Sequence, residues 1–168
     1  MTQAALEMDA LDILGGPRAV LKATRAKRAR RPSSRNPSGE MPSIELGDLH
    51  WVSIIRDGLP AKSFEATARA LALPQTELAK ALGLVVRTLQ RRLAKRDRLT
   101  HEESERSIRA ARTLAKANAV LGRENGRDWL REPSRALGGA TPLSLLDTAD
   151  GFTRVMDELG RIEHGVFS

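Results

Sequence analysis

The sequence predicts an all-α fold. From residue 44 onward its apolar residues recur at the three- and four-residue spacing of helices buried on one face. No segment alternates between apolar and polar residues for long enough to predict a β-strand. Aromatic residues make up only 3% of the chain and tyrosine is absent, whereas β-sandwiches and β-barrels depend on aromatic side chains.

Length and composition limit the class of protein. The chain has 168 residues, enough for one compact domain or two small ones. It contains no cysteine, which excludes disulfides, thiol nucleophiles and cysteine-bound metals. No apolar run approaches the roughly 20 residues of a membrane helix, and no secretory signal precedes the first helix. We therefore expect a cytoplasmic protein without a membrane partner.

The first part of the chain, residues 1–43, is expected to hold a helix and a linker. An apolar helical stripe covers residues 4–14 and stops at Gly15-Gly16, and a second helix can begin at Pro17. Residues 31–42 contain three prolines and three serines, so we expect them to be extended or disordered.

Four short helices are expected between residues 44 and 99. They are placed at residues 48–56, 60–71, 75–82 and 86–95. Asp57-Gly58, Leu73-Pro74 and Gly83 separate them. Pro60 suits the first helical position, because no backbone N–H is needed there.

A longer helix is expected to open the remainder, residues 100–168. Thr100 and Glu103 form a capping box ahead of a helix that stops at Gly122. Three later helices are expected. The first covers residues 123–131, the second begins at Pro142 with Thr141 as its N-cap, and the third covers residues 150–163.

Residues 75–93 have the spacing of a helix-turn-helix. Ala79 is the small residue required where the helices cross, and Gly83 permits the positive φ of the turn. The second helix would lie in the major groove of DNA. The residues predicted to contact DNA are Val86, Arg87, Thr88, Gln90, Arg91, Arg92 and Lys95.

Two kinds of contact are expected within this helix. The base readers are expected to be Arg87, Thr88, Gln90 and Arg91, since Arg can bond guanine and Gln adenine through two hydrogen bonds. The phosphate contacts are expected to be Arg92, Lys95, Arg96 and Arg98. The motif usually has an apolar residue at the position of Arg92, but here the apolar residue is Leu93, one position later. This shift predicts that the second helix packs slightly rotated.

The net charge of +7 is concentrated in two basic islands. Residues 18–35 hold eight bases and no acid, and residues 85–98 hold six bases and one acid. The second island coincides with the predicted recognition helix and favours binding of a polyanion. The alternatives are a flexible tail for the first island and a structural hairpin with a solvated basic face for the second.

Nothing in the sequence indicates catalysis, a metal or a cofactor. His50, His101 and His164 lie in three separate segments, and none has a second histidine at helical spacing. No nucleophile elbow, phosphate-binding loop or dinucleotide fingerprint occurs. We therefore expect a protein that is not an enzyme.

Several separated motifs together resemble the Xre/MbcA/ParS-type antitoxins. They are Leu14-Gly-Gly, Ile55-Arg-Asp-Gly-Leu-Pro60, Arg87-Thr-Leu-Gln-Arg-Arg-Leu93 and Leu99-Thr-x-Glu-Glu-Ser-Glu-Arg106, followed by Trp129-Leu-x-x-Pro133, Leu137-Gly-Gly-x-Thr-Pro142-Leu and Leu159-Gly-Arg-Ile-Glu-His-Gly-Val-Phe-Ser168. The resemblance covers residues 44–168 and extends weakly back to Leu11.

The resemblance implies an antitoxin of a type II toxin–antitoxin system. Such antitoxins combine an Xre-like DNA-binding domain, here residues 44–99, with a toxin-binding domain, here residues 100–168. Their partners are RES-domain toxins, which degrade NAD or transfer ADP-ribose. The antitoxin's C-terminal segment covers the toxin's NAD pocket, and the complex represses its own promoter.

By position, the residues implied to contact the toxin are Arg161, Glu163, His164, Gly165, Val166 and Phe167. From the residues alone, Val166 and Phe167 either pack back onto their own core or serve a partner. A homodimer is expected because readers of half-sites usually pair. The alternative function is a stand-alone transcriptional regulator without a toxin partner.

Overall fold

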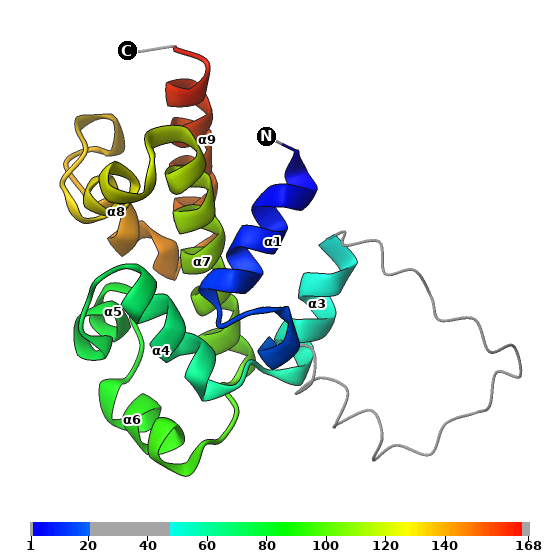
Figure 1. The fold of residues 1–168 in the computed structure, drawn as a ribbon. Helices are drawn as coiled ribbons and strands as arrows, with labels where there is room; N and C mark the ends of the chain where they lie inside the picture. The colour runs from blue at the N-terminus through cyan, green and yellow to red at the C-terminus, as the bar shows by residue number, and fades with distance from the viewer. Residues whose placement is uncertain (1, 21–47, 166–168) are drawn as a thin grey trace, which may run out of the picture.

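The structure, a computed structural model, describes residues 2–20 and 48–165, and its described part is all-α, as predicted (Figure 1). The α-helices are α1 (Gln3–Ile13), α3 (Asp48–Asp57), α4 (Ala61–Ala70), α5 (Gln75–Ala81), α6 (Val86–Lys95), α7 (His101–Leu121), α8 (Arg123–Arg131) and α9 (Ala149–Glu163). Two 3₁₀-helices, η1 (Arg135–Leu137) and η2 (Pro142–Asp147), connect α8 to α9. The predicted linker at residues 31–42 lies outside the described residues.

Helix α7 is the centre of the fold. It packs against α1, α3 and α4, which precede it in the chain, and against α8, η2 and α9, which follow it. Its buried face is rich in alanine, with Ala110, Ala111, Ala115 and Ala117 almost inaccessible to solvent. Small side chains allow neighbouring helices to approach closely. Helix α8 approaches in this way, and Gly126 faces the backbone of α7 at Ala117.

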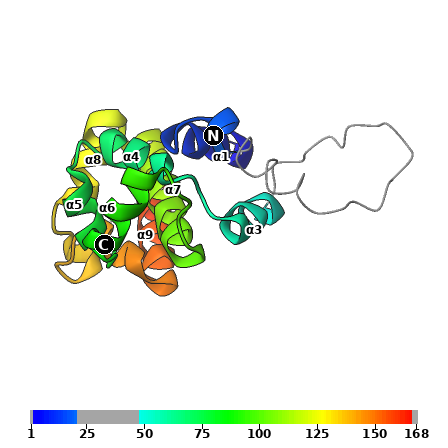
Figure 2. The same ribbon diagram turned by 90° about the horizontal axis from the view of Figure 1, so that it is seen from below.

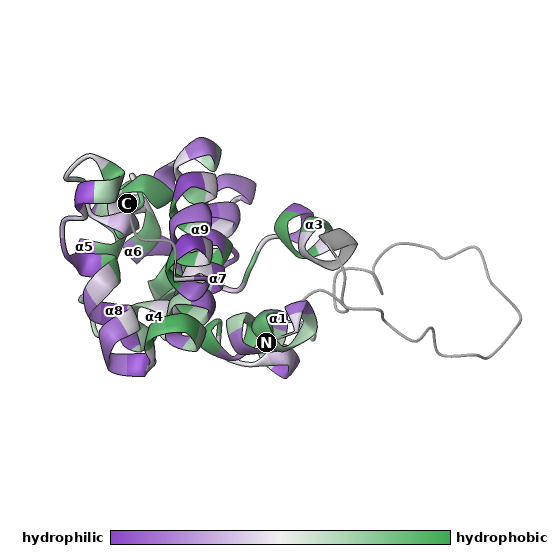
Figure 3. Ribbon diagram, turned by 90° about the horizontal axis from the view of Figure 1, so that it is seen from above, coloured by the Kyte–Doolittle hydropathy of each residue, from purple (hydrophilic) through white to green (hydrophobic). Residues whose placement is uncertain are grey.

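One cluster of buried apolar side chains runs through the whole described chain. It includes Leu11 of α1, Phe64 of α4, Leu114 of α7, Leu130 of α8 and Leu159 of α9, each at most 1% exposed. Where α9 is visible in Figure 3, much of its ribbon has the colour of hydrophilic residues, while α1 has more of the colour of hydrophobic ones. The amino-terminal helix is therefore a part of the core and not an appendage.

The start of α4 differs from the prediction. Pro60 is the N-cap, with φ −58° and ψ 137°, and the first helical residue is Ala61. Pro60 is extended because it forms an antiparallel bridge with Arg98. The N–H of Leu99 donates to the carbonyl of Leu59 at 2.8 Å, and the N–H of Ala61 donates to the carbonyl of Asp97 at 3.1 Å.

A glycine is required beside this bridge. Gly58 has φ +78°, and a Cβ there would lie 2.4 Å from the carbonyl oxygen of Leu99. The guanidinium of Arg98, predicted to hold a phosphate, donates to the carbonyl of Gly58 at 2.7 Å. The loop before α4 and the segment after α6 are thus joined by backbone and side-chain bonds.

The two regions predicted to bind partners lie at opposite ends of the molecule. Helix α6 is at one end and the carboxyl end of α9 is at the other (Figure 1). Seen from below, α6 lies with α4 and α5, and α3 projects to the side (Figure 2). The two predicted regions therefore do not overlap.

Candidate nucleic-acid interface and carboxyl-terminal surface

Helices α5 and α6 form the helix-turn-helix at the predicted positions. Ala79 is completely buried where the helices meet, and Leu78, Leu82 and Leu89 are buried around it. Gly83 has φ +62° in the turn. The N–H of Leu84 donates to the carbonyl of Ala79 at 2.8 Å and closes the turn.

An arginine of α7 fixes the turn from behind. The guanidinium of Arg106 donates to the carbonyls of Leu82 at 2.8 Å and Gly83 at 2.9 Å. These carbonyls end α5 and have no partner within that helix. Arg106 also pairs with Glu102 one turn earlier in α7. Arg106 ends one of the family motifs in the sequence, but no local signal there indicates a contact with residues more than twenty positions away.

A second arginine joins α6 to α7. The Nε of Arg92 lies 3.1 Å from Oε2 of Glu103, and its Nη1 donates to the carbonyl of Arg98 at 3.3 Å. The same carboxylate accepts the N–H of Thr100 at 2.7 Å, which completes the predicted capping box. The motif usually has an apolar side chain at position 92, whereas Arg92 pairs here with Glu103 in the first turn of α7. The contact of Arg92 with phosphate stays a prediction.

The exposed face of α6 is cationic. Arg87, Gln90, Arg91 and Lys95 are exposed and Thr88 is half-buried. In the ranges 2–20 and 48–165, none of the three cations of this face is in an ion pair. Their charges are free to meet an anion. Val86, also predicted to contact DNA, is half-buried and packs against the core.

The end of α9 presents several of the residues implied to contact a toxin. Arg161, Glu163, His164 and Gly165 are exposed, and Gly165 has φ +69° after the last helical turn. Val166 and Phe167, the other two, lie outside the described residues.

Two of these side chains already have ionic partners. Glu163 pairs with Lys116 of α7, and the hydrogen bond from Lys116 holds the pKa of the Glu163 carboxyl below its usual value. Arg161 lies 3.5 Å from Glu158 on its own helix. The pair between Glu163 and Lys116 joins the end of α9 to the central helix. Its energetic contribution is small, because Glu163 is exposed to solvent.

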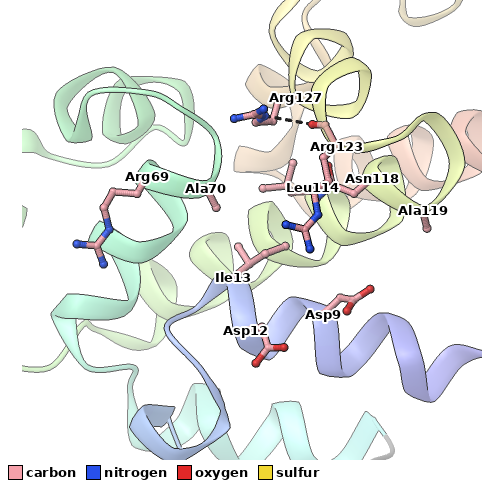
Figure 4. Close-up of a pocket in the computed structure, with 10 residues that line it drawn as sticks. All are labelled: Asp9, Asp12, Ile13, Arg69, Ala70, Leu114, Asn118, Ala119, Arg123 and Arg127. Atoms are coloured by element: carbon pink, nitrogen blue, oxygen red, sulfur yellow. Dashed lines mark hydrogen bonds between the residues drawn. The ribbon is translucent and has the colours of Figure 1, made fainter.

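A cleft of about 730 Å³ lies between α1, α4, α7 and α8, away from both predicted sites. Asp9 and Asp12 lie on one side of it, and Arg123 and Arg127 lie opposite (Figure 4). Arg69 completes the charged lining. No motif in the sequence indicated this cleft, because its walls come from four separate segments.

Within residues 2–20 and 48–165, no three His, Cys, Asp or Glu side chains are placed to hold a metal ion together. In the same ranges, no helix has the length and apolarity required to span a bilayer.

Two family models match the chain. The antitoxin Xre-like helix-turn-helix domain matches residues 50–112, and the antitoxin Xre/MbcA/ParS C-terminal toxin-binding domain matches residues 116–165. The two matches meet inside α7, whereas the predicted domain boundary lies just before this helix.

Curated proteins resemble the chain over most of their length. Antitoxin Xre of Yersinia enterocolitica is 36% identical over 119 residues, which is 70% of this chain and 80% of the relative. Antitoxin Xre of Photorhabdus laumondii is 31% identical over 121 residues, 71% of this chain and 82% of the relative. The Prs ADP-ribosylating antitoxin of a Sphingobium species is 31% identical over 127 residues, 70% and 80% respectively. These relatives are antitoxins and not enzymes, so this chain, with its helix-turn-helix domain and its toxin-binding domain, belongs to the Xre/MbcA/ParS antitoxin family.

Proposed function

We propose that this antitoxin neutralises a RES-domain toxin by covering the toxin's NAD site with its carboxyl-terminal segment. The observation that carries the proposal is the exposed end of α9, from Arg161 to Gly165, inside the matched toxin-binding domain. The Sphingobium relative supports the chemistry, because its name refers to ADP-ribosylation, which consumes NAD.

The proposal includes repression of the antitoxin's own operon. Unpaired Arg87, Arg91 and Lys95 on the exposed face of α6 suit contacts with DNA phosphates and bases. A homodimer would present two α6 helices to half-sites roughly one DNA turn apart. Because α6 and the end of α9 lie at opposite ends, one chain can hold toxin and operator together.

The test is co-expression of the antitoxin with the adjacent reading frame of its operon. We expect full-length antitoxin to restore growth, and the variant lacking residues 161–168 to fail while still binding promoter DNA. Arg91→Ala is the reciprocal control: it should lose roughly 1–3 kcal/mol of specific DNA binding and keep full protection.

Three outcomes would contradict parts of the proposal. Full protection by the shortened variant would exclude the covering mechanism. Equal promoter affinity of Arg91→Ala and wild type would exclude α6 as the reading helix. An adjacent frame that is harmless on its own would leave a DNA-binding regulator without a toxin.

A further inference from the structure

Val85 is the most exposed of the large apolar side chains in the described ranges. It is 69% exposed, compared with 41% for Val52 and 38% for Met8. Its neighbours Leu84 and Val86 are half-buried and pack against the core. The chain thus turns one apolar side chain outwards between two that face inwards.

Neither the fold nor the helix explains a valine at this position. Val85 is the N-cap of α6, in extended conformation with φ −75° and ψ 101°, and its side chain makes no capping hydrogen bond. Ser, Thr, Asp or Asn would cap the helix through a side-chain oxygen. Valine at this position provides no capping hydrogen bond and exposes an apolar side chain to solvent. Contact between this side chain and an apolar group of a partner would explain both features.

The surroundings of Val85 indicate which partner. It begins the helix whose exposed face carries Arg87, Arg91 and Lys95. Side chains at the start of a recognition helix reach base edges in the major groove. The 5-methyl group of thymine is the apolar group displayed there, and small apolar side chains contact it.

We propose that Val85 contacts the 5-methyl group of a thymine in each operator half-site and selects A·T at that position. This inference rests on the proposed operator binding and adds a specificity determinant that the sequence analysis did not include. Val86, the apolar residue predicted to contact DNA, packs inwards, and Val85 takes the apolar role in its place.

The experiment measures binding of the full chain to duplexes from its own promoter by fluorescence anisotropy. The half-site is first located as the promoter segment that the bound protein protects from nuclease digestion. Each thymine in it is then replaced singly by deoxyuridine, which removes only the methyl group. For wild type, we expect one replacement to weaken binding about three- to five-fold, the effect of one buried methylene-sized group. For Val85→Ala, which lacks the two γ-methyl groups of valine, the same replacement should have a clearly smaller effect than for wild type.

Matched controls separate this contact from general effects. Val52→Ala shortens another exposed valine, on α3, and should keep both wild-type affinity and the response to deoxyuridine. Thermal denaturation should give equal midpoints for Val85→Ala and wild type, since Val85 is outside the core.

The outcomes distinguish this inference from the proposed function. Wild type that does not bind the promoter would overturn both this inference and the proposed repression of the operon. If wild type binds the promoter and no deoxyuridine replacement changes its affinity, the role of Val85 alone would be overturned. The role would equally fail if Val85→Ala responded to deoxyuridine as strongly as wild type does.

Discussion

Two glycines inside helices have different physical roles. At Gly126 of α8, a Cβ would lie 2.8 Å from the carbonyl carbon of Ala117 and 2.9 Å from its oxygen. At Gly160 of α9, a Cβ would have no atom of the described residues within 4 Å apart from its own stretch of helix. The first glycine permits the contact between α7 and α8, and the second is not required by any contact among the described residues.

We therefore predict opposite effects of the same substitution. Gly126→Ala should lower the free energy of unfolding by about 1–3 kcal/mol, because the backbone of α7 must move aside. Gly160→Ala should raise it by up to about 1 kcal/mol, because alanine loses less entropy in a helix. Urea denaturation measures both, and equal signs for the two variants would contradict this interpretation.

At the scale of elements, the helix-turn-helix is held by its neighbour α7 as well as by its own apolar contacts. Arg106 binds the carbonyls that end α5, and Glu103 pairs with Arg92 of α6. Both contacts connect the helix-turn-helix to the first two turns of α7. The orientation of α6 is therefore set partly from outside the motif.

We predict that Arg106→Ala weakens promoter binding although Arg106 itself faces α5. Loss of the charged donor should cost about 1–3 kcal/mol of stability and leave two carbonyls of the turn without that partner. Arg69→Ala removes the same charge from an exposed arginine with no hydrogen bond or ion pair in the described chain, and should leave promoter affinity unchanged. Promoter titrations of the two variants at equal salt are the measurement, and equal affinities would exclude a positioning role for Arg106.

At the scale of the whole molecule, the described helices share one core. Leu11 and Leu14 of the amino-terminal segment are completely buried in the same cluster as Leu114 and Leu159. A core without an internal boundary favours cooperative unfolding.

Calorimetry should therefore show a single unfolding transition for the described helices. Leu11→Ala should destabilise this one transition by about 2–5 kcal/mol, since it opens a cavity against α7. Met8→Ala, on an exposed side chain of the same helix, should change it little. Two separate transitions, or a Leu11→Ala variant as stable as Met8→Ala, would contradict the shared core.

Where the signals are local, the sequence determined the structure closely. The bounds of α6 and α8 agree with the prediction, and the capping box of Thr100 and Glu103 is present. Ala79 and Gly83 lie at the crossing and the turn of the helix-turn-helix, as predicted. These features depend on residues within about five positions of each other, so helical period, capping and turn chemistry suffice to predict them.

Only the tertiary structure decided the rest. The bridge that makes Pro60 an N-cap joins it to a residue 38 positions later, and Arg106 reaches back 24 positions to Leu82. The burial of Leu11 likewise follows from how α1 packs against the distant helix α7. Such contacts require distant segments to be brought together by the collapse of the core, and no pattern of neighbouring residues encodes which segments will meet.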